Sequence, residues 1–472
     1  MAADTSTIEV IDVEGWGIHP VPSSQRRLGA FDFAILWGDL AVSLLIIAAG
    51  SLLVPSLSTK EALLAVVVGN VVGAGLLAAA GIIGSQTGVP TMVSLRAVLG
   101  IRGSYLGSGF NVLQLLGWAA LEIIIMAKLA SGLSDHFLGF SGYYFWLMAF
   151  GVLGTAMAIG GPALVVRHYM QKFGVWVVLA ASLWLTVRLF DAYDFESIWN
   201  RGGEGGVSNF FHGLDLVISL PVSWLPLVGD YSRFARKAGS AALGTYAGYG
   251  LANIWFFALG VLYVSALDTD YVGFFSGGAF VDMLVPLALG WLALIALLAG
   301  ETDEVFANIY STAVSVRNVA PRFGHGLLAL AVGAVAIVLA ISLDALSYEP
   351  FLLLIGGVFV PLFGVLLADF FVVRGRSYDV GQLYGRDGSY WYAGGVNFVG
   401  VGIWVLGFVL YTLAAQPSWL TTHDSFDFVS WAPETIGFID EIGGTIPAFV
   451  FSFVAYWAAA RMWLGSGRQQ EA

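Results

Sequence analysis

Residues 285–311 read VPLALGWLALIALLAGETDEVFANIYS, and this stretch governs how the whole chain is interpreted. The run from Val285 to Ala299 carries no charge, whereas Glu301, Asp303 and Glu304 follow it almost directly. A carboxylate in hydrocarbon costs about 2.5–3.5 kcal/mol on insertion scales, so acids at that depth mark an ion or substrate pathway. Two interpretations are open. Either the helix ends at residue 300 and leaves its acids among lipid headgroups, or it carries them into the protein interior.

Composition places the chain in the membrane class. Of its 472 residues, 58% are hydrophobic and 11% are charged, whereas soluble proteins carry about 25% charged residues. The chain has no cysteine, which excludes disulfides, thiolate metal sites and thiol nucleophiles. Its six histidines are scattered, and neither a zinc motif nor a phosphate-binding glycine loop occurs. We therefore expect no enzymatic activity, no catalytic residues, no nucleic-acid partner, and no cofactor besides a transported Na⁺ or H⁺.

The apolar runs predict twelve transmembrane helices. A bilayer core takes about 20 apolar residues per helix, and a scan with this length gives spans at residues 31–55, 61–83, 106–131, 143–160, 173–190, 210–229, 242–266, 280–311, 326–343, 350–373, 394–415 and 444–464. The chain is thus expected to be an all-α polytopic membrane protein.

The basic residues predict the orientation. With both termini in the cytoplasm, 16 of the 20 lysines and arginines fall on the inner side, as the positive-inside rule requires. They are Arg26, Arg27, Arg96, Arg102, Arg167, Lys172, Arg233, Arg236, Lys237, Arg317, Arg322, Arg374, Arg376, Arg386, Arg461 and Arg468. Residues 1–28 lack an apolar core and a cleavage site, so we interpret them as a cytoplasmic tail rather than a signal peptide.

Two of the predicted spans contain interruptions. Gly38-Asp39 interrupts the first, and Pro221, Pro226 and Gly229 interrupt the sixth. Proline frees a backbone carbonyl, which in a membrane is tolerated only beside a cavity or a protein partner. Breaks five spans apart predict an inverted repeat, with the substrate near the midplane between them. The predicted units are residues 1–28 (tail), 29–190 (spans 1–5), 208–375 (spans 6–10), 392–464 (spans 11–12) and 465–472 (tail).

Trp118 and Glu122 are four residues apart in the third predicted span, and so share one helix face. An indole ring offers a stacking platform for a flat heterocycle, and a carboxylate one turn away can accept hydrogen bonds from N–H groups. A tryptophan alone is equally well explained by packing or lipid contact. An acid within a span, however, must face the protein interior. We therefore predict that this pair binds substrate.

Four further carboxylates fall at plausible membrane depth, namely Asp39, Glu301, Asp303 and Glu304. Few cations accompany them, since Lys128 lies near the end of its span, where a lysine side chain snorkels to the interface. Asp39 alone is also explained by a purely structural pairing with a neighbouring helix. As a group, uncompensated acids suit a transported cation or proton whose binding is coupled to substrate.

Several short segments occur in a characteristic order along the chain. They are PVP at 20–22 with Arg26-Arg27, GVPT at 88–91, GIRG at 100–103, Gly117-Trp118 through Glu122, GDYSRF at 229–234 and ANIYS at 307–311. This ordered set resembles the nucleobase:cation symporter family 1, which includes cytosine and allantoin permeases, benzyl-hydantoin carriers and hydroxymethylpyrimidine permeases. The segments LWG at 36–38 and TDEVFAN at 302–308 are most similar to the hydroxymethylpyrimidine permeases.

The resemblance implies the five-plus-five inverted-repeat fold of the leucine-transporter type with two additional helices. It also implies alternating access around a site between spans 1, 3, 6 and 8. Trp118 matches the stacking tryptophan of the family, Glu122 the position of a substrate-binding glutamine, and Asn308 that of a substrate-binding asparagine. This placement favours the second interpretation of the acids at 301–304, in which they lie in the middle of the membrane.

The chain departs from the family pattern at two places. The second aromatic plate of the family, on span 6, falls at Pro221, with Ser223 and Trp224 nearby. The pair of hydroxyl residues that binds sodium in span 8 aligns with Thr302-Asp303. These two residues are therefore the predicted sodium ligands, although the aspartate would equally suit a proton.

The combined expectation is a secondary-active, cation-coupled importer of a pyrimidine-type nucleobase, either hydroxymethylpyrimidine or cytosine, in the cytoplasmic membrane. The base would stack on Trp118, with Glu122 and Asn308 reading its amino and ring-nitrogen groups. The cation would be held by Asp39 and Thr302-Asp303 with carbonyls of the broken first span. An amino-acid or small-amine carrier of the same fold, a channel and a non-transporting membrane receptor stay open as alternatives. The oligomeric state is not determined by the sequence, and we expect a monomer.

Overall fold

The structure is a computed structural model of the chain, and it describes residues 18–160, 175–276, 278–287, 289–319, 323–344, 347–417 and 441–468. Within these ranges the regular structure is helical, and the extended backbone amounts to two isolated bridges, Leu28 with Ala235 and Ala393 with Val396. Residues 418–440, between the last two predicted spans, lie outside the described residues, as do residues 1–17 and 469–472.

The longer helices follow the apolar runs of the sequence. They are α2 (Ala30–Asp39), α3 (Leu44–Ser51), α4 (Thr59–Thr87), α7 (Ser104–Leu138), α8 (Tyr143–Gly160), α10 (Val175–Ala192), α12 (Val207–Ser223), α13 (Leu225–Ser232), α14 (Ala238–Ala266), α16 (Gly290–Val319), α17 (His325–Ser342), α18 (Tyr348–Leu367), α19 (Phe398–Ala415) and α22 (Thr445–Arg468). Short helices connect them: η1 (Ser23–Gln25), α5 (Thr91–Ser94), α6 (Arg96–Leu99), α11 (Phe195–Trp199), η3 (Val272–Ser276), α15 (Ala279–Leu284), η5 (Ala368–Val373) and η6 (Gly381–Leu383).

The polytopic all-helical class is confirmed. In the described part of the chain, nine spans are long and apolar enough to cross a membrane, and the bent pair α2–α3 adds a tenth. The helices α10 and α16 occupy the fifth and eighth predicted spans, although neither is among those ten. For α16 the reason lies in its sequence, because Glu301, Asp303 and Glu304 fall inside it.

The first span is broken next to the predicted position. Helix α2 ends at Asp39, α3 begins at Leu44, and their axes differ by 66°. The Oγ of Ser43 accepts a hydrogen bond from Leu45 N (3.0 Å) and so caps the start of α3. The sixth span is interrupted less sharply, because α12 and α13 meet at Trp224 and together form the single span Val207–Ser232.

The predicted eighth span was wrong at its beginning. Instead of one helix over 280–311, α15 ends at Leu284 and α16 begins at Gly290. Pro286 follows α15, and Leu289 adopts a left-handed φ of 68°, so the helix cannot run through this segment. The other end of α16 extends to Val319. A helix that stops at residue 300 is therefore excluded, and its acids lie within the helix.

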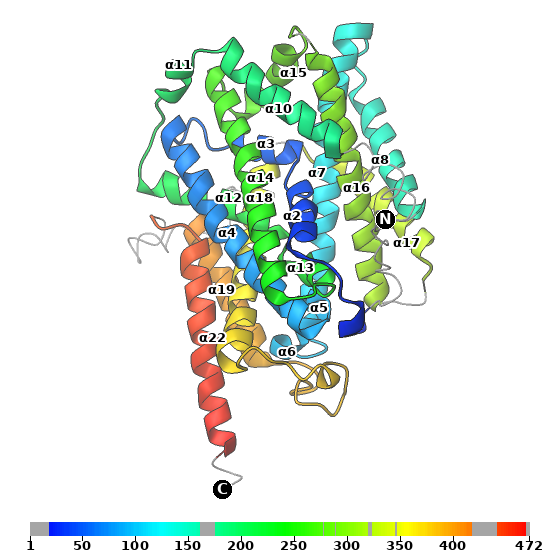
Figure 1. Cartoon of the computed structure of the whole chain (residues 1–472), viewed down its shortest axis with the longest axis vertical. Coiled ribbons are helices and arrows are strands. Elements are labelled where there is room, and N and C mark those ends of the chain that lie inside the picture. The colour runs from blue at the N-terminus through cyan, green and yellow to red at the C-terminus, as the bar shows by residue number, and fades with distance from the viewer. Residues whose placement is uncertain are drawn as a thin grey trace, which may run out of the picture.

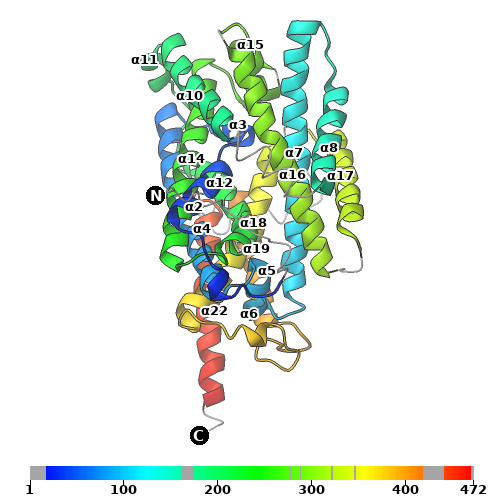
Figure 2. The same cartoon turned by 45° about the vertical axis from the view of Figure 1, so that its right-hand side comes forward.

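The broken helices lie at the centre of the bundle (Figure 1). Helices α2 and α3 pack on α14, while α7 packs on α16 and α8, and α17 packs on α8 (Figure 2). Glycine permits close approaches between these helices, because a Cβ at Gly248 of α14 would collide with the backbone carbonyl of Ala34 in α2. Helices α19 and α22 pack against each other and on α18, at one edge of the bundle in Figure 1.

The described part of the N-terminal tail is tied to the ends of other elements. Tyr384 donates its hydroxyl to the carbonyl of Ile18 (2.5 Å), and Arg26 Nη1 donates to the carbonyl of Ser85 at the end of α4 (2.8 Å). Burial raises the pKa of the Tyr384 phenol to about 12, so this hydroxyl stays protonated at neutral pH. At the other end of the chain, α22 continues to Arg468, beyond the predicted limit of 464. The predicted repeat boundaries and the orientation of the termini stay predictions.

Candidate functional site

A cavity lies between the two breaks. Its wall is formed by side chains of α3, α7, α12, α13, α14 and α16, together with Leu40, Ser43 and Trp224 at the breaks themselves. Most of the lining is apolar. The polar contributions come from Ser43, Glu122, Ser223, Tyr249, Glu304 and Asn308, along with the indoles of Trp118 and Trp224.

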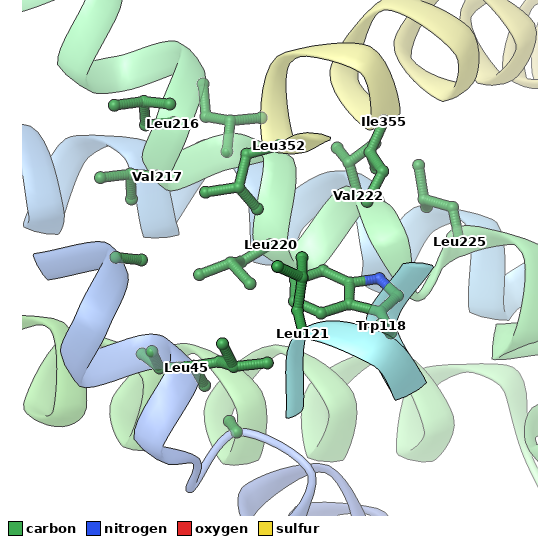
Figure 3. Close-up of a cluster of buried hydrophobic side chains, with 14 of the residues drawn as sticks. Leu45, Trp118, Leu121, Leu216, Val217, Leu220, Val222, Leu225, Leu352 and Ile355 are labelled. Carbon is green, nitrogen blue, oxygen red and sulfur yellow. The ribbon is translucent and has the colours of Figure 1, made fainter. Parts of the chain in front are cut away.

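Trp118 faces the cavity and is not a lipid-facing aromatic. Its side chain is 8% exposed, and its ring contacts Phe351 edge-on at a centroid distance of 5.2 Å. Figure 3 shows the ring in a cluster of buried apolar side chains that includes Leu220 of α12 and Leu45 of α3. Because Leu45 and Leu220 also line the cavity, the indole lies at the boundary between this cluster and the cavity.

Glu122 and Asn308 meet directly, although 186 residues separate them in the chain. The Nδ2 of Asn308 donates to Oε1 of Glu122 at 2.9 Å and to Oε2 at 3.1 Å. Both side chains are buried, and both line the cavity. A carboxylate has about four lone-pair positions, so Glu122 retains capacity to accept hydrogen bonds from another molecule.

Of the three candidates in span 6, two reach the cavity. Ser223 and Trp224 line it, whereas Pro221 is not among its lining residues. Pro221 is buried against α4 instead, where its ring occupies the space that a side chain at Gly73 would need. The indole of Trp224 packs edge-on against Trp37 of α2, with ring centroids 5.9 Å apart.

Two of the acids of α16, Glu304 and Glu301, have different surroundings. Glu304 lines the cavity, whereas Glu301 accepts hydrogen bonds from Ser43 Oγ (3.2 Å) and from the backbone amide of Leu44, at the start of α3. A carboxylate is favourable there, because the N-terminus of a helix carries unpaired N–H groups and a partial positive charge. Glu301 therefore joins α16 to the break in the first span.

The predicted cation ligands lie at the end of α2 (Asp39) and in α16 (Thr302 and Asp303). Thr302 is buried and donates to the carbonyl of Leu298 (2.9 Å). Asp303 and Asp39 are half-buried, and they lie close enough for their negative charges to repel each other. In the described part of the chain, no three histidine or acidic side chains come close enough to hold a metal ion. Across the same residues, none of the five membrane carboxylates forms an ion pair with Lys, Arg or His.

Sequence reasoning missed three residues around the cavity, Ser43, Gln114 and Tyr249. Ser43 and Tyr249 line the cavity, and Gln114 of α7 donates a hydrogen bond to the backbone carbonyl of Ser223 in α12. Gln114 precedes Trp118 by four residues, so helical spacing was a usable signal for its face. Tyr249 is one of 18 tyrosines, and nothing in its local sequence sets it apart.

A polytopic helical bundle with interrupted helices around a mostly apolar cavity that holds a few polar groups is the architecture of a secondary transporter. The chain belongs to the family described as "Permease for cytosine/purines, uracil, thiamine, allantoin", whose family model matches residues 20–428. It is therefore a permease and not an enzyme.

Known relatives and solved structures agree with this assignment. The chain is 23% identical over 430 residues to a hydantoin permease of Microbacterium maritypicum, covering 85% of this chain and 83% of the relative. It is 25% identical over 426 residues to the allantoin permease of Bacillus subtilis (strain 168), covering 82% and 84%. A nucleobase-cation-symport-1 family transporter, solved in a closed conformation with bromovinylhydantoin bound, superposes with a TM-score of 0.74 at 20% identity, covering 96% of each chain. Its fold is the fold of this protein.

Proposed function

We propose that the protein is a cation-coupled importer of an aminopyrimidine, hydroxymethylpyrimidine or cytosine, which works by alternating access. The observation that carries the proposal is the Glu122–Asn308 pair in the cavity wall, one helical turn from Trp118. The base stacks on the indole, its amino group donates to the free lone pairs of Glu122, and the amide of Asn308 reads a ring nitrogen. A carboxylate accepts hydrogen bonds only, which favours a donor-rich base over carbonyl-rich uracil.

The charge of the cavity argues against an α-amino-acid carrier. Its described lining contains Glu122 and Glu304 but no lysine, arginine or histidine. Broken helices can bind a substrate carboxylate at a half-helix N-terminus, but the first amides of α3 are already occupied. Leu44 N donates to Glu301 and Leu45 N donates to Ser43 Oγ. A substrate carboxylate would be repelled by Glu122 and Glu304, and the amides of Leu44 and Leu45 would not be free to bind it.

The coupling cation is proposed to bind beside the same breaks. Five carboxylates without ion-pair partners in the described residues are expensive in a low-dielectric interior, and a cation that enters with the substrate would offset part of this cost. Asp303, the hydroxyl of Thr302, Asp39 and carbonyls between α2 and α3 are the candidate sodium ligands. Protonation of Asp39, Asp303 or Glu304 is the alternative mode of coupling. The excess of basic residues on one side supports an orientation with both termini in the cytoplasm.

The test is uptake of labelled hydroxymethylpyrimidine and cytosine into proteoliposomes, with and without an inward sodium gradient at fixed pH. Saturable accumulation against the substrate gradient is the expected result. A requirement for sodium would support the Thr302–Asp303 site, whereas accumulation driven by a proton gradient alone would assign coupling to the carboxylates. Accumulation of an amino acid without uptake of either base would refute the proposed substrate class. Gradient-independent flux would refute a coupled carrier.

A further inference from the structure

Gln114 lies on the same face of α7 as the proposed substrate residues. Gln114, Trp118 and Glu122 follow one another at intervals of four residues, which places them in one stripe along the helix. The side chain of Gln114 is 4% exposed, and Gln114 does not line the cavity. A buried amide next to a membrane cavity requires hydrogen-bond partners, and these partners reveal its role.

The principal partner of Gln114 is a backbone carbonyl at the interruption of the sixth span. Gln114 Nε2 donates to the carbonyl oxygen of Ser223 at 2.9 Å, across 109 residues of sequence. In a regular helix that carbonyl would accept from Leu227 N, but Leu227 N donates to Trp224 O instead (3.0 Å). The side chain from α7 therefore replaces the helical donor that the interruption removes.

A second amide fixes the orientation of Gln114. Asn111, one turn earlier in α7, accepts from the same Nε2 through its Oδ1 at 2.9 Å. Asn111 is also buried, at 1% exposed. The amide nitrogen of Gln114 is thus held between its own helix and the backbone of the sixth span.

We infer that Gln114 is a positioning residue that sets the distance between Trp118 and Trp224, the two indole rings that line the proposed substrate site. Helix α7 carries Trp118 directly, and through Gln114 it holds the backbone next to Trp224. The inference rests on the proposed function for the identity of the substrate. One helix, α7, would thus determine the positions of both Trp118 and Trp224. Stacking of a base on these rings does not by itself require a polar residue at position 114.

The decisive experiment is a double-mutant cycle on uptake of cytosine or hydroxymethylpyrimidine. Gln114→Met keeps the length of the side chain and removes the donor, and we expect KM to rise about fivefold with little change in Vmax. If Gln114 acts through Trp224, the same substitution in a Trp224→Ala background should change KM less than about twofold. An unchanged KM in the single variant, or the full rise in the Trp224→Ala background, would overturn the inference.

A matched control separates this role from general stability. Asn253→Leu removes another buried interhelical amide bond, from Asn253 Nδ2 to Asn70 Oδ1 (2.6 Å), between α14 and α4. The Asn253 side chain does not line the cavity. We expect this variant to lose thermal stability while its KM stays within about twofold of the wild type.

A second readout does not depend on the substrate. Because the chain has no cysteine, a Ser223→Cys variant carries a single thiol in the cavity wall, and maleimide labelling reports how tightly the interruption is held. Adding Gln114→Met should accelerate labelling about fivefold. An unchanged labelling rate would overturn the inference even if neither base is transported. Absence of uptake by wild-type protein, with accelerated labelling, would refute the proposed substrate alone.

Discussion

Replacing Glu122 by glutamine should shift the specificity of the transporter away from cytosine and towards uracil, two bases of nearly equal size. The carboxylate of Glu122 is 3% exposed and accepts from Asn308 through both oxygens. A glutamine keeps the volume and one acceptor oxygen, which can still bind the Asn308 amide. It replaces the second oxygen by an NH₂ donor. Aminopyrimidines then lose a charged acceptor, while the 4-carbonyl of uracil gains a donor.

The size of the effect follows from the kind of bond that is exchanged. A hydrogen bond to a charged group contributes about 1.5–3 kcal/mol, so cytosine should lose about 10- to 150-fold in kcat/KM. A neutral hydrogen bond gained by uracil contributes about 0.5–1.5 kcal/mol, or roughly 2- to 10-fold. The ratio of the two specificities should therefore shift by about 20-fold at the least.

The assay is competition between labelled cytosine and labelled uracil for uptake by the same proteoliposomes. Because both bases meet the same molecules, the ratio is independent of how much protein is folded. Glu61→Gln is the matched control, since Glu61 likewise accepts a hydrogen bond from another side chain, Ser58 Oγ at 2.7 Å, but lies at the start of α4 and outside the cavity lining. A ratio for the Glu122 variant that stays within twofold of wild type would refute the role assigned to this carboxylate.

Three further predictions concern single contacts of the site and its frame. Trp118→Ala should raise KM about 5- to 150-fold, because stacking of a base on an aromatic ring contributes about 1–3 kcal/mol. Trp118→Phe should recover most of the loss, and equal KM values for the two variants would contradict a stacking role. Glu301→Ala should leave the start of α3 without its acceptor and lower the free energy of unfolding by about 1–3 kcal/mol, seen as a fall in the thermal unfolding temperature in detergent. Glu301→Gln should lose less stability, and no loss in either variant would show that Glu301 does not stabilise the start of α3. Asp215→Ala should remove the carboxylate that accepts hydrogen bonds from Gly444 N (2.6 Å) and Thr445 N (2.9 Å) at the start of α22. We expect the free energy of unfolding to fall by about 1–2 kcal/mol in thermal unfolding with KM unchanged, and a changed KM would mean that α22 influences the site.

The fold was predictable because the solvent imposes it. Each span must be helical and about 20 residues long in a bilayer. The apolar runs alone therefore placed most of the long helices to within a few residues, with larger errors at the start of α16 and at the end of α7. The acids at 301–304 were predictable as interior residues through the family resemblance, which placed Asn308 at a substrate-binding position on span 8, and α16 runs to Val319 as that placement requires. Pro286 was present in the sequence, but its effect was underestimated, and α15 was merged with α16.

Helical spacing also identified the face of α7 that carries Trp118 and Glu122, because residues four apart share a face whatever surrounds the helix. It could not determine how each helix is rotated against its neighbours. The meeting of Glu122 with Asn308, the presentation of Trp224 rather than Pro221 to the cavity, and the bond from Gln114 to Ser223 all depend on packing between helices distant in sequence. The rotation and register of packed helices are set by side chains that interlock across the interface, such as Pro221 against Gly73. The sequence therefore defined the helices and the chemical groups they carry, whereas packing alone decided which of these groups face one another.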